Sequence, residues 1–205
     1  MYMKNMKALI DSMIISGTVK SPEIIDAFGT IDRKYFVPRV LAELCYVDAP
    51  LSIGNDQTIS QPSTVAFMLE HLSVKEGDKV LDIGSGSGWT TALLCHIVGT
   101  NGSVTGLERV DALLEQGRKN LSHFHFTHCH IEKAGEDLGL PGKHFDRILV
   151  SASADEIPEK LFSQLKIGGI LVMPVRNSIF KFKKISESEV RKEEFYGFRF
   201  VPLIY

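Results

Sequence analysis

Residues 79–88 read KVLDIGSGSG, and WTTALLCHIV follows at 89–98. The apolar run up to Gly84 predicts a buried strand, and the segment near 88–98 predicts a helix. Glycines at 84, 86 and 88 would let the backbone approach a ligand closely. Ligands of α/β sheets bind at the carboxyl ends of the strands. The stretch therefore predicts a ligand-binding loop between a sheet strand and its helix.

The residues that follow repeat this alternation of strand and helix. Short apolar runs predict strands, and runs with helical spacing predict helices. Such alternation indicates a Rossmann-like α/β fold with a mostly parallel, doubly wound sheet and helices on both faces. The expected strands lie near 79–84, 103–108, 128–134, 146–151 and 170–175, and the expected helices near 88–98, 111–121 and 156–165.

The two ends of the chain read differently. The N-terminal part predicts a helical cap, with helices over 3–16, from Pro22 behind a Ser21 cap to about Phe28, and over 62–72, and a loop-rich stretch at 32–50. In the tail, IFKFKKI at 179–185 and GFRFVPLI at 197–204 predict two strands that form an antiparallel edge. We expect one domain over 1–205, with the cap and a substrate loop at 1–61 and the α/β core with its C-terminal strands at 62–205.

Composition limits the classes of partner. The chain has 205 residues, a net charge of -2 and a pI near 6.4, so it lacks the basic field of a nucleic-acid-binding protein. Its longest apolar runs are far short of a membrane span, and MYMKNMKALIDSM at 1–13 has no apolar core of signal-peptide length. We expect a cytoplasmic protein that binds neither nucleic acid nor membrane. A monomer is expected because no extended apolar stripe remains outside the core.

Cysteine and histidine residues raise two further questions. Cys45, Cys95 and Cys129 are odd in number and far apart, which favours free thiols in a reducing cytosol over a disulfide framework. HFHFTHCH at 123–130 suggests a metal site, but its spacing matches no recognised ligand pattern. Alternation there favours phenylalanines inward and histidines outward, so we predict no metal.

The glycine loop narrows the cofactor. A dinucleotide fingerprint G-x-G-x-x-G would need glycine where Trp89 stands, and Trp89 is expected to pack in the core. G-x-G-x-G behind the acidic Asp82 instead resembles the first motif of S-adenosylmethionine-dependent methyltransferases. By that resemblance the loop would cradle the methionine end of the cofactor through Asp82, Gly84, Ser85, Gly86 and Gly88. Glu108 ends the next strand, where a carboxylate can accept hydrogen bonds from both ribose hydroxyls.

Residues 54–66, GNDQTISQPSTVA, precede the helix expected at 62–72. Thr58 and Ser60 alternate with Ile59, so both hydroxyls would project to one side of an extended segment. Pro62 suits the first turn of a helix. Ser60 could therefore be the helix cap, or it could present its hydroxyl to a ligand, or do both.

QTISQP followed by an apolar helix and then VLDIGSGSG resembles the protein-L-isoaspartate (D-aspartate) O-methyltransferase family. The resemblance continues, in the family's order, through RKYFVP at 33–38, YVDAPLSIG at 46–54, residues 145–175 and FVPL at 200–203. Asp56 stands where the family usually has glycine. Ala134-Gly135-Glu136 stands in place of Gly-Asp-Gly near the adenine, and Ala154-Asp155 in place of Ala-Pro.

The resemblance implies a protein repair enzyme. It would transfer a methyl group from S-adenosylmethionine to the free α-carboxylate of L-isoaspartyl residues in damaged proteins and peptides, with D-aspartyl residues as a second substrate. Ser60 would aim the carboxylate, Thr58 and Ile59 would shape the same wall, and this loop would close over cofactor and substrate. Gly135 and Glu136 would contact the adenine.

Two other functions remain open from the sequence. The departures at residue 56 and at residues 134–136 keep alive a related methyltransferase that acts on another carboxylate or on a small molecule. A non-catalytic cofactor-binding scaffold is the third hypothesis, and it would need neither Ser60 nor an intact glycine loop.

Overall fold

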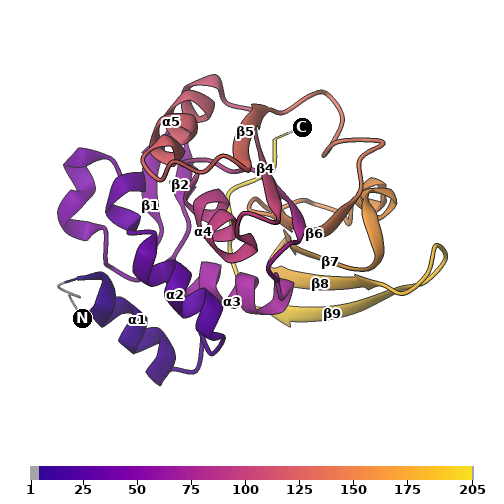
Figure 1. Cartoon of the computed structure of the whole chain (residues 1–205), viewed down its shortest axis with the longest axis horizontal. Coiled ribbons are helices and arrows are strands. Elements are labelled where there is room, and N and C mark those ends of the chain that lie inside the picture. The colour runs from indigo at the N-terminus through magenta and orange to yellow at the C-terminus, as the bar shows by residue number, and fades with distance from the viewer. Residues whose placement is uncertain (1–4, 205) are drawn as a thin grey trace.

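The computed structural model describes residues 5–204, and its centre is a twisted sheet with the strand order β5-β4-β3-β6-β7-β8-β9 (Figure 1). The first five strands in this order are parallel, and β8 and β9 form an antiparallel hairpin at one edge. The strands are β3 (Lys79–Ile83), β4 (Ser103–Glu108), β5 (Cys129–Lys133), β6 (Phe145–Val150), β7 (Leu165–Val175), β8 (Ser178–Lys184) and β9 (Val190–Tyr196).

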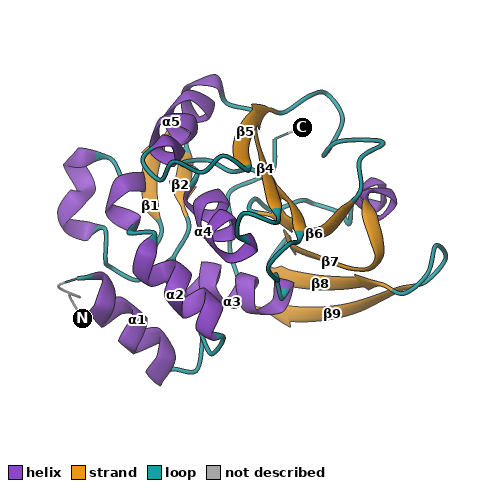
Figure 2. Cartoon of the chain, viewed as in Figure 1, coloured by secondary structure: helices purple, strands orange, loops and turns teal. Residues whose placement is uncertain are grey.

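The α-helices of residues 5–204 all join the hydrophobic cluster on one face of this sheet (Figure 2). Alternate strand residues supply the two faces, so Val80 of β3 joins the helices while Leu81 points to the other cluster. The opposite face is covered by a 3-10 helix (Glu159–Gln164) and by loops, not by the α-helices we expected there. The helices are α1 (Met6–Ile15), α2 (Pro22–Thr30), α3 (Pro62–Leu72), α4 (Trp89–Val98) and α5 (Asp111–Ser122).

Most expected elements are confirmed to within a residue or two. The apolar spacing of the first helix is confirmed, since Met6, Leu9, Ile10 and Met13 are its buried residues; its expected start at residue 3 lies outside the described residues. Ser21 sits at the N-cap of α2, but its hydroxyl donates to Glu70 Oε2 (2.8 Å) instead of accepting from the helix.

Two expectations near the C-terminus are wrong. The helix expected at 156–165 is the 3-10 turn, because Pro158 disfavours a helical conformation at Ile157 and few residues then remain before β7. The last strand is the charged segment Val190–Tyr196, not 197–204. An exposed edge strand tolerates charged side chains, which also discourage pairing with other chains. Residues 197–204 instead cross the carboxyl ends of the parallel strands.

A small hairpin, separate from the main sheet, is formed by β1 (Leu51–Gly54) and β2 (Gln57–Ile59). Its two turn residues, Asn55 and Asp56, both have positive φ (53° and 57°), the geometry of a type I′ turn. A residue with positive φ is often glycine, which is the family's usual residue at position 56. Asp56 adopts the same backbone conformation, so the turn is kept. The structure makes Asp56 an exposed turn residue of the hairpin.

Arg33 holds this hairpin to the rest of the chain. Its side chain is fully buried (0% exposed), and its guanidinium donates to the carbonyls of Cys45, Val47, Ala49 and Ser60 at 3.0–3.1 Å. It lies 5.3 Å from the ring centre of Trp89 at the start of α4. Burial lowers the pKa of Arg33 to about 10, so the group keeps its charge at neutral pH.

Among residues 5–204 no helix is both long and apolar enough to cross a bilayer.

Replacing Arg33 by alanine should destabilise the fold strongly. The change leaves four buried or half-buried carbonyls without their donor, and each such group costs about 1–3 kcal/mol. We expect the free energy of unfolding, measured by urea denaturation, to fall by at least about 3 kcal/mol. Arg39→Ala is the matched control, because Arg39 is exposed and makes no hydrogen bond within the described residues. A loss no larger than that of the control would contradict the role of Arg33.

Candidate functional site

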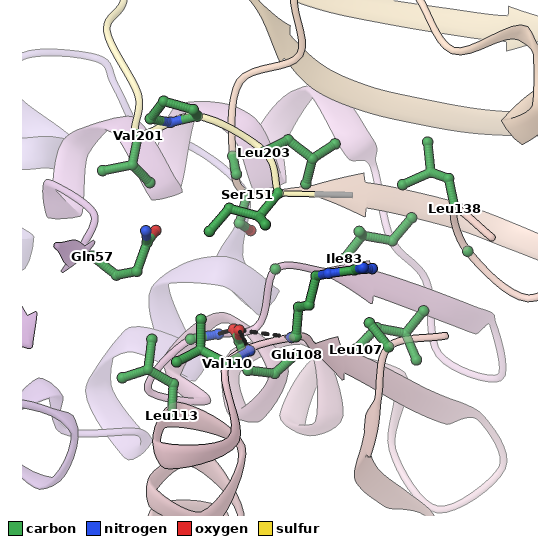
Figure 3. Close-up of a pocket in the computed structure, with 18 of the residues that line it drawn as sticks. Gln57, Ile83, Leu107, Glu108, Val110, Leu113, Leu138, Ser151, Val201 and Leu203 are labelled. Atoms are coloured by element: carbon green, nitrogen blue, oxygen red, sulfur yellow. Dashed lines mark hydrogen bonds between the residues drawn. The ribbon is translucent and has the colours of Figure 1, made fainter. Parts of the chain in front are cut away.

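Two adjoining pockets open at the carboxyl ends of β3, β4 and β6. The first, here called the sheet pocket, lies where the strand order reverses between β3 and β6, the usual ligand position in such sheets. It is lined by the glycine loop and by segments from five other parts of the chain: the hairpin residues 53, 57 and 58, residues 107–110 with 113, residues 134–139, residues 151–152, and residues 201–204. In Figure 3, Val201 and Leu203 lie across the pocket from Glu108 and Val110.

The glycine loop has the backbone of a ligand cradle. Gly84, Gly86 and Gly88 all have positive φ (79°, 52° and 84°), which side chains rarely adopt. Gly84 and Gly86 line the sheet pocket, and a Cβ on Gly86 would come within 3.3 Å of Ile53 on the hairpin. Gly88 lines neither pocket; a Cβ there would lie 3.0 Å from the carbonyl oxygen of Gly117, so it allows α5 to pack closely. The loop thus offers bare backbone where S-adenosylmethionine is expected.

Ser85, a predicted cofactor residue, belongs to the glycine loop but lines neither pocket. Its hydroxyl oxygen is buried and has no hydrogen-bond partner within the described residues. A buried polar group without a partner is unfavourable unless a ligand or a water satisfies it. The bare backbone of Gly84 and Gly86 fits the polar methionine end of the cofactor that the resemblance implies, whereas the Ser85 side chain lies beside Gly106 of β4, where a Cβ would come within 3.2 Å of Ser85 Cβ.

Glu108 sits at the end of β4 and is almost fully buried. One carboxylate oxygen accepts from the backbone nitrogens of Arg109 and Val110, and the other accepts from Gly86 N, all at 2.8 Å. The same carboxylate lines the sheet pocket. It therefore links the glycine loop to the start of α5 and presents an acceptor where ribose hydroxyls are expected.

The segment after β5 forms the far wall of the sheet pocket. Gly135 and Glu136 both line it, together with Asp137, so an acidic group does lie at this wall despite the departure from Gly-Asp-Gly. The Arg109 guanidinium donates to the carbonyl oxygen of Gly135 (3.1 Å) and holds the segment in place. Leu138 adds apolar surface that suits a purine ring (Figure 3).

Asp82, like Ser85 and Gly88, does not reach the pockets. It is fully buried beneath the loop, lines neither pocket, and accepts hydrogen bonds from Thr91 (2.6 Å) and Ser151 (3.3 Å). Burial raises the pKa of Asp82 to about 6. Its contacts make it a support for the loop and for Ser151, which lines both pockets.

The second pocket, here called the hairpin pocket, adjoins the first. Its lining includes Thr58, Ser60 and Gln61 from the hairpin side and Arg199 and Val201 from the C-terminal segment. Thr58, Ser151 and Val201 line both pockets. A group held in one pocket can therefore meet a group held in the other without leaving the protein.

Ser60 presents a free hydroxyl to the hairpin pocket. Its carbonyl accepts from Arg33, but its side chain makes no hydrogen bond with any described residue. The alternative that Ser60 caps α3 is wrong. Asp48 does this instead, accepting from Ser63 N (2.9 Å) and from Gln61 Nε2 (3.2 Å). Ile59, predicted beside Ser60 in the wall, is buried in the core (4% exposed) and lines neither pocket.

Four residues that contribute to this site were not predicted from the sequence. Arg33 and Asp48 lie in the loop-rich region, where no periodicity marks their role, although both fall within stretches that carry the family resemblance. Ser151 and Arg199 carry no local sequence signal, and it is the fold that places both of them in the lining of the hairpin pocket. The departures at Asp56 and Asp155 lie outside both pockets.

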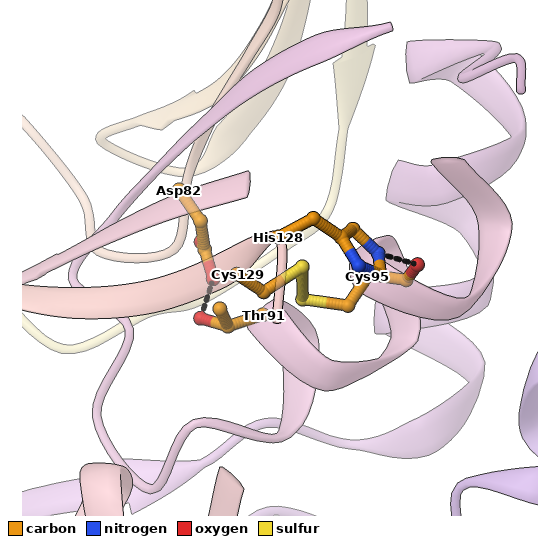
Figure 4. Close-up of a disulfide and its surroundings, with 5 residues drawn as sticks. All are labelled: Asp82, Thr91, Cys95, His128 and Cys129. Carbon is orange, nitrogen blue, oxygen red and sulfur yellow. Dashed lines mark hydrogen bonds between the residues drawn. A yellow bond between two sulfur atoms is a disulfide. The ribbon is translucent and has the colours of Figure 1, made fainter. Parts of the chain in front are cut away.

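A disulfide ties the helix after the glycine loop to the edge of the sheet. Cys95 of α4 and Cys129 of β5 are bonded, with their Cα atoms 6.1 Å apart, so the prediction that both are free thiols is wrong (Figure 4). The two cysteines are 34 residues apart in the sequence, so their spacing did not predict the bond. They meet because α4 packs directly on β5. Cys45 remains a free, buried thiol. Next to the disulfide, His128 Nε2 lies 3.2 Å from the carbonyl oxygen of Cys95.

The state of the cysteines can be counted directly. Thiol titration of the denatured, unreduced chain should find one reactive group, Cys45, and titration after reduction should find three. Reduction should lower the free energy of unfolding by about 2–4 kcal/mol, the usual contribution of a native disulfide. Three thiols before reduction, in protein purified without reductant, would contradict the pairing. Cys45→Ser, which removes the free thiol, should leave the effect of reduction unchanged.

Glu108→Gln should weaken binding of S-adenosylhomocysteine by about 10- to 100-fold, because hydrogen bonds to a charged group are worth about 1.5–3 kcal/mol. The amide also brings a donor toward Gly86 N, which has no acceptor to offer in return. Calorimetric titration measures the affinity, and circular dichroism checks the fold. Glu132→Gln is the control, since Glu132 lies on β5 outside both pockets. Equal affinities of the two variants would refute the assignment of Glu108.

Comparison with known proteins agrees with this geometry. The family model described as protein-L-isoaspartate (D-aspartate) O-methyltransferase matches residues 4–205. A protein-L-isoaspartate O-methyltransferase of Ignicoccus hospitalis is 37% identical, covering 97% of this chain and 96% of the relative. Another, from Fervidobacterium nodosum, is 40% identical over 89% of this chain and 94% of the relative.

A solved structure shares the whole fold. The Plasmodium falciparum protein described as a protein-L-isoaspartate O-methyltransferase, crystallised with S-adenosyl-L-homocysteine, superposes with a TM-score of 0.88. It is 25% identical, and the match covers 98% of this chain and 99% of that one. On this evidence the chain belongs to the protein-L-isoaspartate (D-aspartate) O-methyltransferase family.

Proposed function

We propose that the chain transfers a methyl group from S-adenosylmethionine to the free α-carboxylate of L-isoaspartyl residues in damaged proteins and peptides. D-aspartyl residues, which the family's name includes, are the second proposed substrate. One observation carries the proposal: the pocket with a free Ser60 hydroxyl adjoins the pocket with the glycine loop, and Thr58, Ser151 and Val201 line both. The methyl donor would occupy the sheet pocket and the methyl acceptor the hairpin pocket, and the two pockets adjoin.

The sheet pocket is the proposed donor site. When bound, S-adenosylmethionine supplies a methyl group activated by its sulfonium charge. Gly84 and Gly86 would hold its polar end, with Ser85 setting the course of the loop between them, and Glu108 would hold its ribose. Gly135 and Glu136 would border its adenine. Asp82 and Gly88 support this site from behind, through hydrogen bonding to Thr91 and Ser151 and through close packing on Gly117.

The hairpin pocket is the proposed acceptor site, and its chemistry needs no strong base. A carboxylate is already ionised at neutral pH. Its oxygen lone pair forms the new carbon–oxygen bond, and the electron pair of the broken carbon–sulfur bond stays on sulfur, so one positive and one negative charge disappear together. The protein contributes orientation and exclusion of water.

Ser60 is the proposed catalytic residue, through a hydrogen bond that aims the carboxylate. Its position is set without using its hydroxyl, because Arg33 binds its carbonyl and Asp48 caps the helix that follows. Thr58 lines both pockets and is proposed to border the methyl-transfer point. Ile59 anchors the strand in the core, so its proposed role is to support this wall from behind.

We propose the cytoplasm as the site of action and a monomer as the acting unit. The disulfide between Cys95 and Cys129 is compatible with the cytoplasm, since both cysteines are buried and shielded from reductants. The large apolar side chains that are exposed, such as Ile15, Val40 and Ile167, lie on separate elements. That scatter supports a chain that acts alone.

Ser60→Ala should lower kcat/KM for an isoaspartyl peptide by about 10- to 100-fold, because it removes one hydrogen bond to a charged acceptor worth about 1.5–3 kcal/mol. The assay follows methyl transfer from labelled S-adenosylmethionine to an isoaspartyl peptide and to its aspartyl twin. We expect transfer to the isoaspartyl peptide alone.

Ser52→Ala is the matched control, since Ser52 lies on the same hairpin with an exposed side chain outside both pockets. It should retain full activity. Transfer to neither peptide, with S-adenosylhomocysteine binding intact, would sink the repair function and point to another acceptor. Full activity of Ser60→Ala would instead remove Ser60 from the mechanism.

A further inference from the structure

The hairpin pocket contains one ionisable side chain among its described lining residues, and it is a cation. Arg199 lies there with Thr58, Ser60, Gln61 and Val201, which are polar or apolar but uncharged. A site for an anionic acceptor therefore carries a single positive charge beside the hydroxyl proposed to aim that acceptor.

The Arg199 guanidinium has no partner within residues 5–204. No carboxylate lies within ion-pair distance of it, and it donates no hydrogen bond there. Most other arginines of the chain are engaged: Arg33, Arg109, Arg118, Arg147, Arg176 and Arg191 each donate to a carbonyl or a carboxylate. Asp48, the carboxylate bound to Gln61 in this region, is already occupied by Ser63 N and Gln61 Nε2.

The backbone holds Arg199 in place from both sides. On one side, Phe198 N donates to the carbonyl oxygen of Asn177 (3.0 Å), and the Phe198 ring packs 5.1 Å from Phe67. On the other, Val201 O accepts from Ser153 N, and Leu203 N donates to Ser153 O, both at 2.8 Å. The residue is thus exposed at its side chain but anchored at its main chain.

We propose that Arg199 is the substrate-recognition residue of the acceptor site, binding the free carboxylate of the damaged residue before methyl transfer. This inference rests on the proposed function. The planar guanidinium matches a carboxylate with two parallel hydrogen bonds, which gives both strength and orientation. Ser60 and Arg199 then hold the carboxylate from the two walls of one pocket.

The reaction determines which kinetic constant this ion pair affects. Methyl transfer turns a carboxylate into a neutral ester, so the ion pair is strongest with the substrate and weakens toward the transition state. An interaction that favours the ground state at least as much as the transition state lowers KM without raising kcat. The same weakening favours release of the ester product.

The test uses a blocked peptide whose only charge is one isoaspartyl carboxylate, so that no other anion can bind the guanidinium. Arg199→Gln should raise KM by about tenfold, the effect of losing a hydrogen bond to a charged group, with kcat unchanged or raised. Arg199→Lys keeps the positive charge but loses the planar guanidinium. Its KM should lie between that of the unaltered chain and that of Arg199→Gln.

A second readout does not depend on turnover. The affinity of the same peptide for the complex with S-adenosylhomocysteine should fall by the same factor in Arg199→Gln, while the affinity for S-adenosylhomocysteine itself stays unchanged and reports an intact fold. Raising the ionic strength should weaken peptide binding to the unaltered chain and have little effect on Arg199→Gln. Arg191→Gln is the charge-matched control, because Arg191 lies on β9 outside both pockets.

The outcomes separate this inference from the function on which it rests. Methylation by the unaltered chain, with an unchanged KM and peptide affinity in Arg199→Gln, overturns the role of Arg199 alone. A fall in kcat at constant KM overturns it as well, since that result marks a transition-state contact. Absence of transfer by the unaltered chain overturns the proposed function, and with it the carboxylate that Arg199 is proposed to hold.

Discussion

The buried cation Arg33 holds the hairpin side of the site together. Arg33 is desolvated, and its charge is matched by carbonyl oxygens from Cys45, Val47, Ala49 and Ser60 and by the face of Trp89. A buried charge is stable only when such partners surround it. The loop at 45–49, the serine of the hairpin and the helix behind the glycine loop are therefore tied to one group. The sheet pocket and the hairpin pocket are held in one framework because of this constraint.

The charges of the two pockets complement the two proposed ligands. Carboxylates of Glu108, Glu136 and Asp137 outnumber the one cation, Arg109, around the sheet pocket, where a sulfonium-bearing donor is proposed. The hairpin pocket carries only Arg199 among its described ionisable groups, and there an anionic acceptor is proposed. Because transfer to a carboxylate moves no proton, the site has no need of a tuned base. In keeping with this, Asp82, a carboxylate whose pKa is raised by burial, lies beneath the loop and lines neither pocket.

Local signals were sufficient for most of the fold and for part of the site. Apolar runs next to glycine marked the parallel strands, and Pro22 and Pro62 marked two helix starts, since both depend on backbone preferences of a few neighbouring residues. The same reasoning failed at the last strand. Apolar Phe198 and Phe200 suggested strand pairing, yet they pack on the core, and the charged segment Val190–Tyr196 pairs instead. Edge position, which is a property of the assembled sheet, decided that choice.

The identity of the loop residues, the order of the elements and the family were accessible from the sequence, because they depend on short motifs and on their spacing. The contacts between distant segments were not. Asp48, not Ser60, caps α3; Cys95 and Cys129 are bonded; and residues 199–203 cross the sheet to meet the hairpin. Each of these facts depends on distances in space between residues far apart in the chain. Ser60 and Arg199, whose side chains have no hydrogen-bond partner among residues 5–204, line one pocket only because the folded sheet brings two distant segments of the chain together.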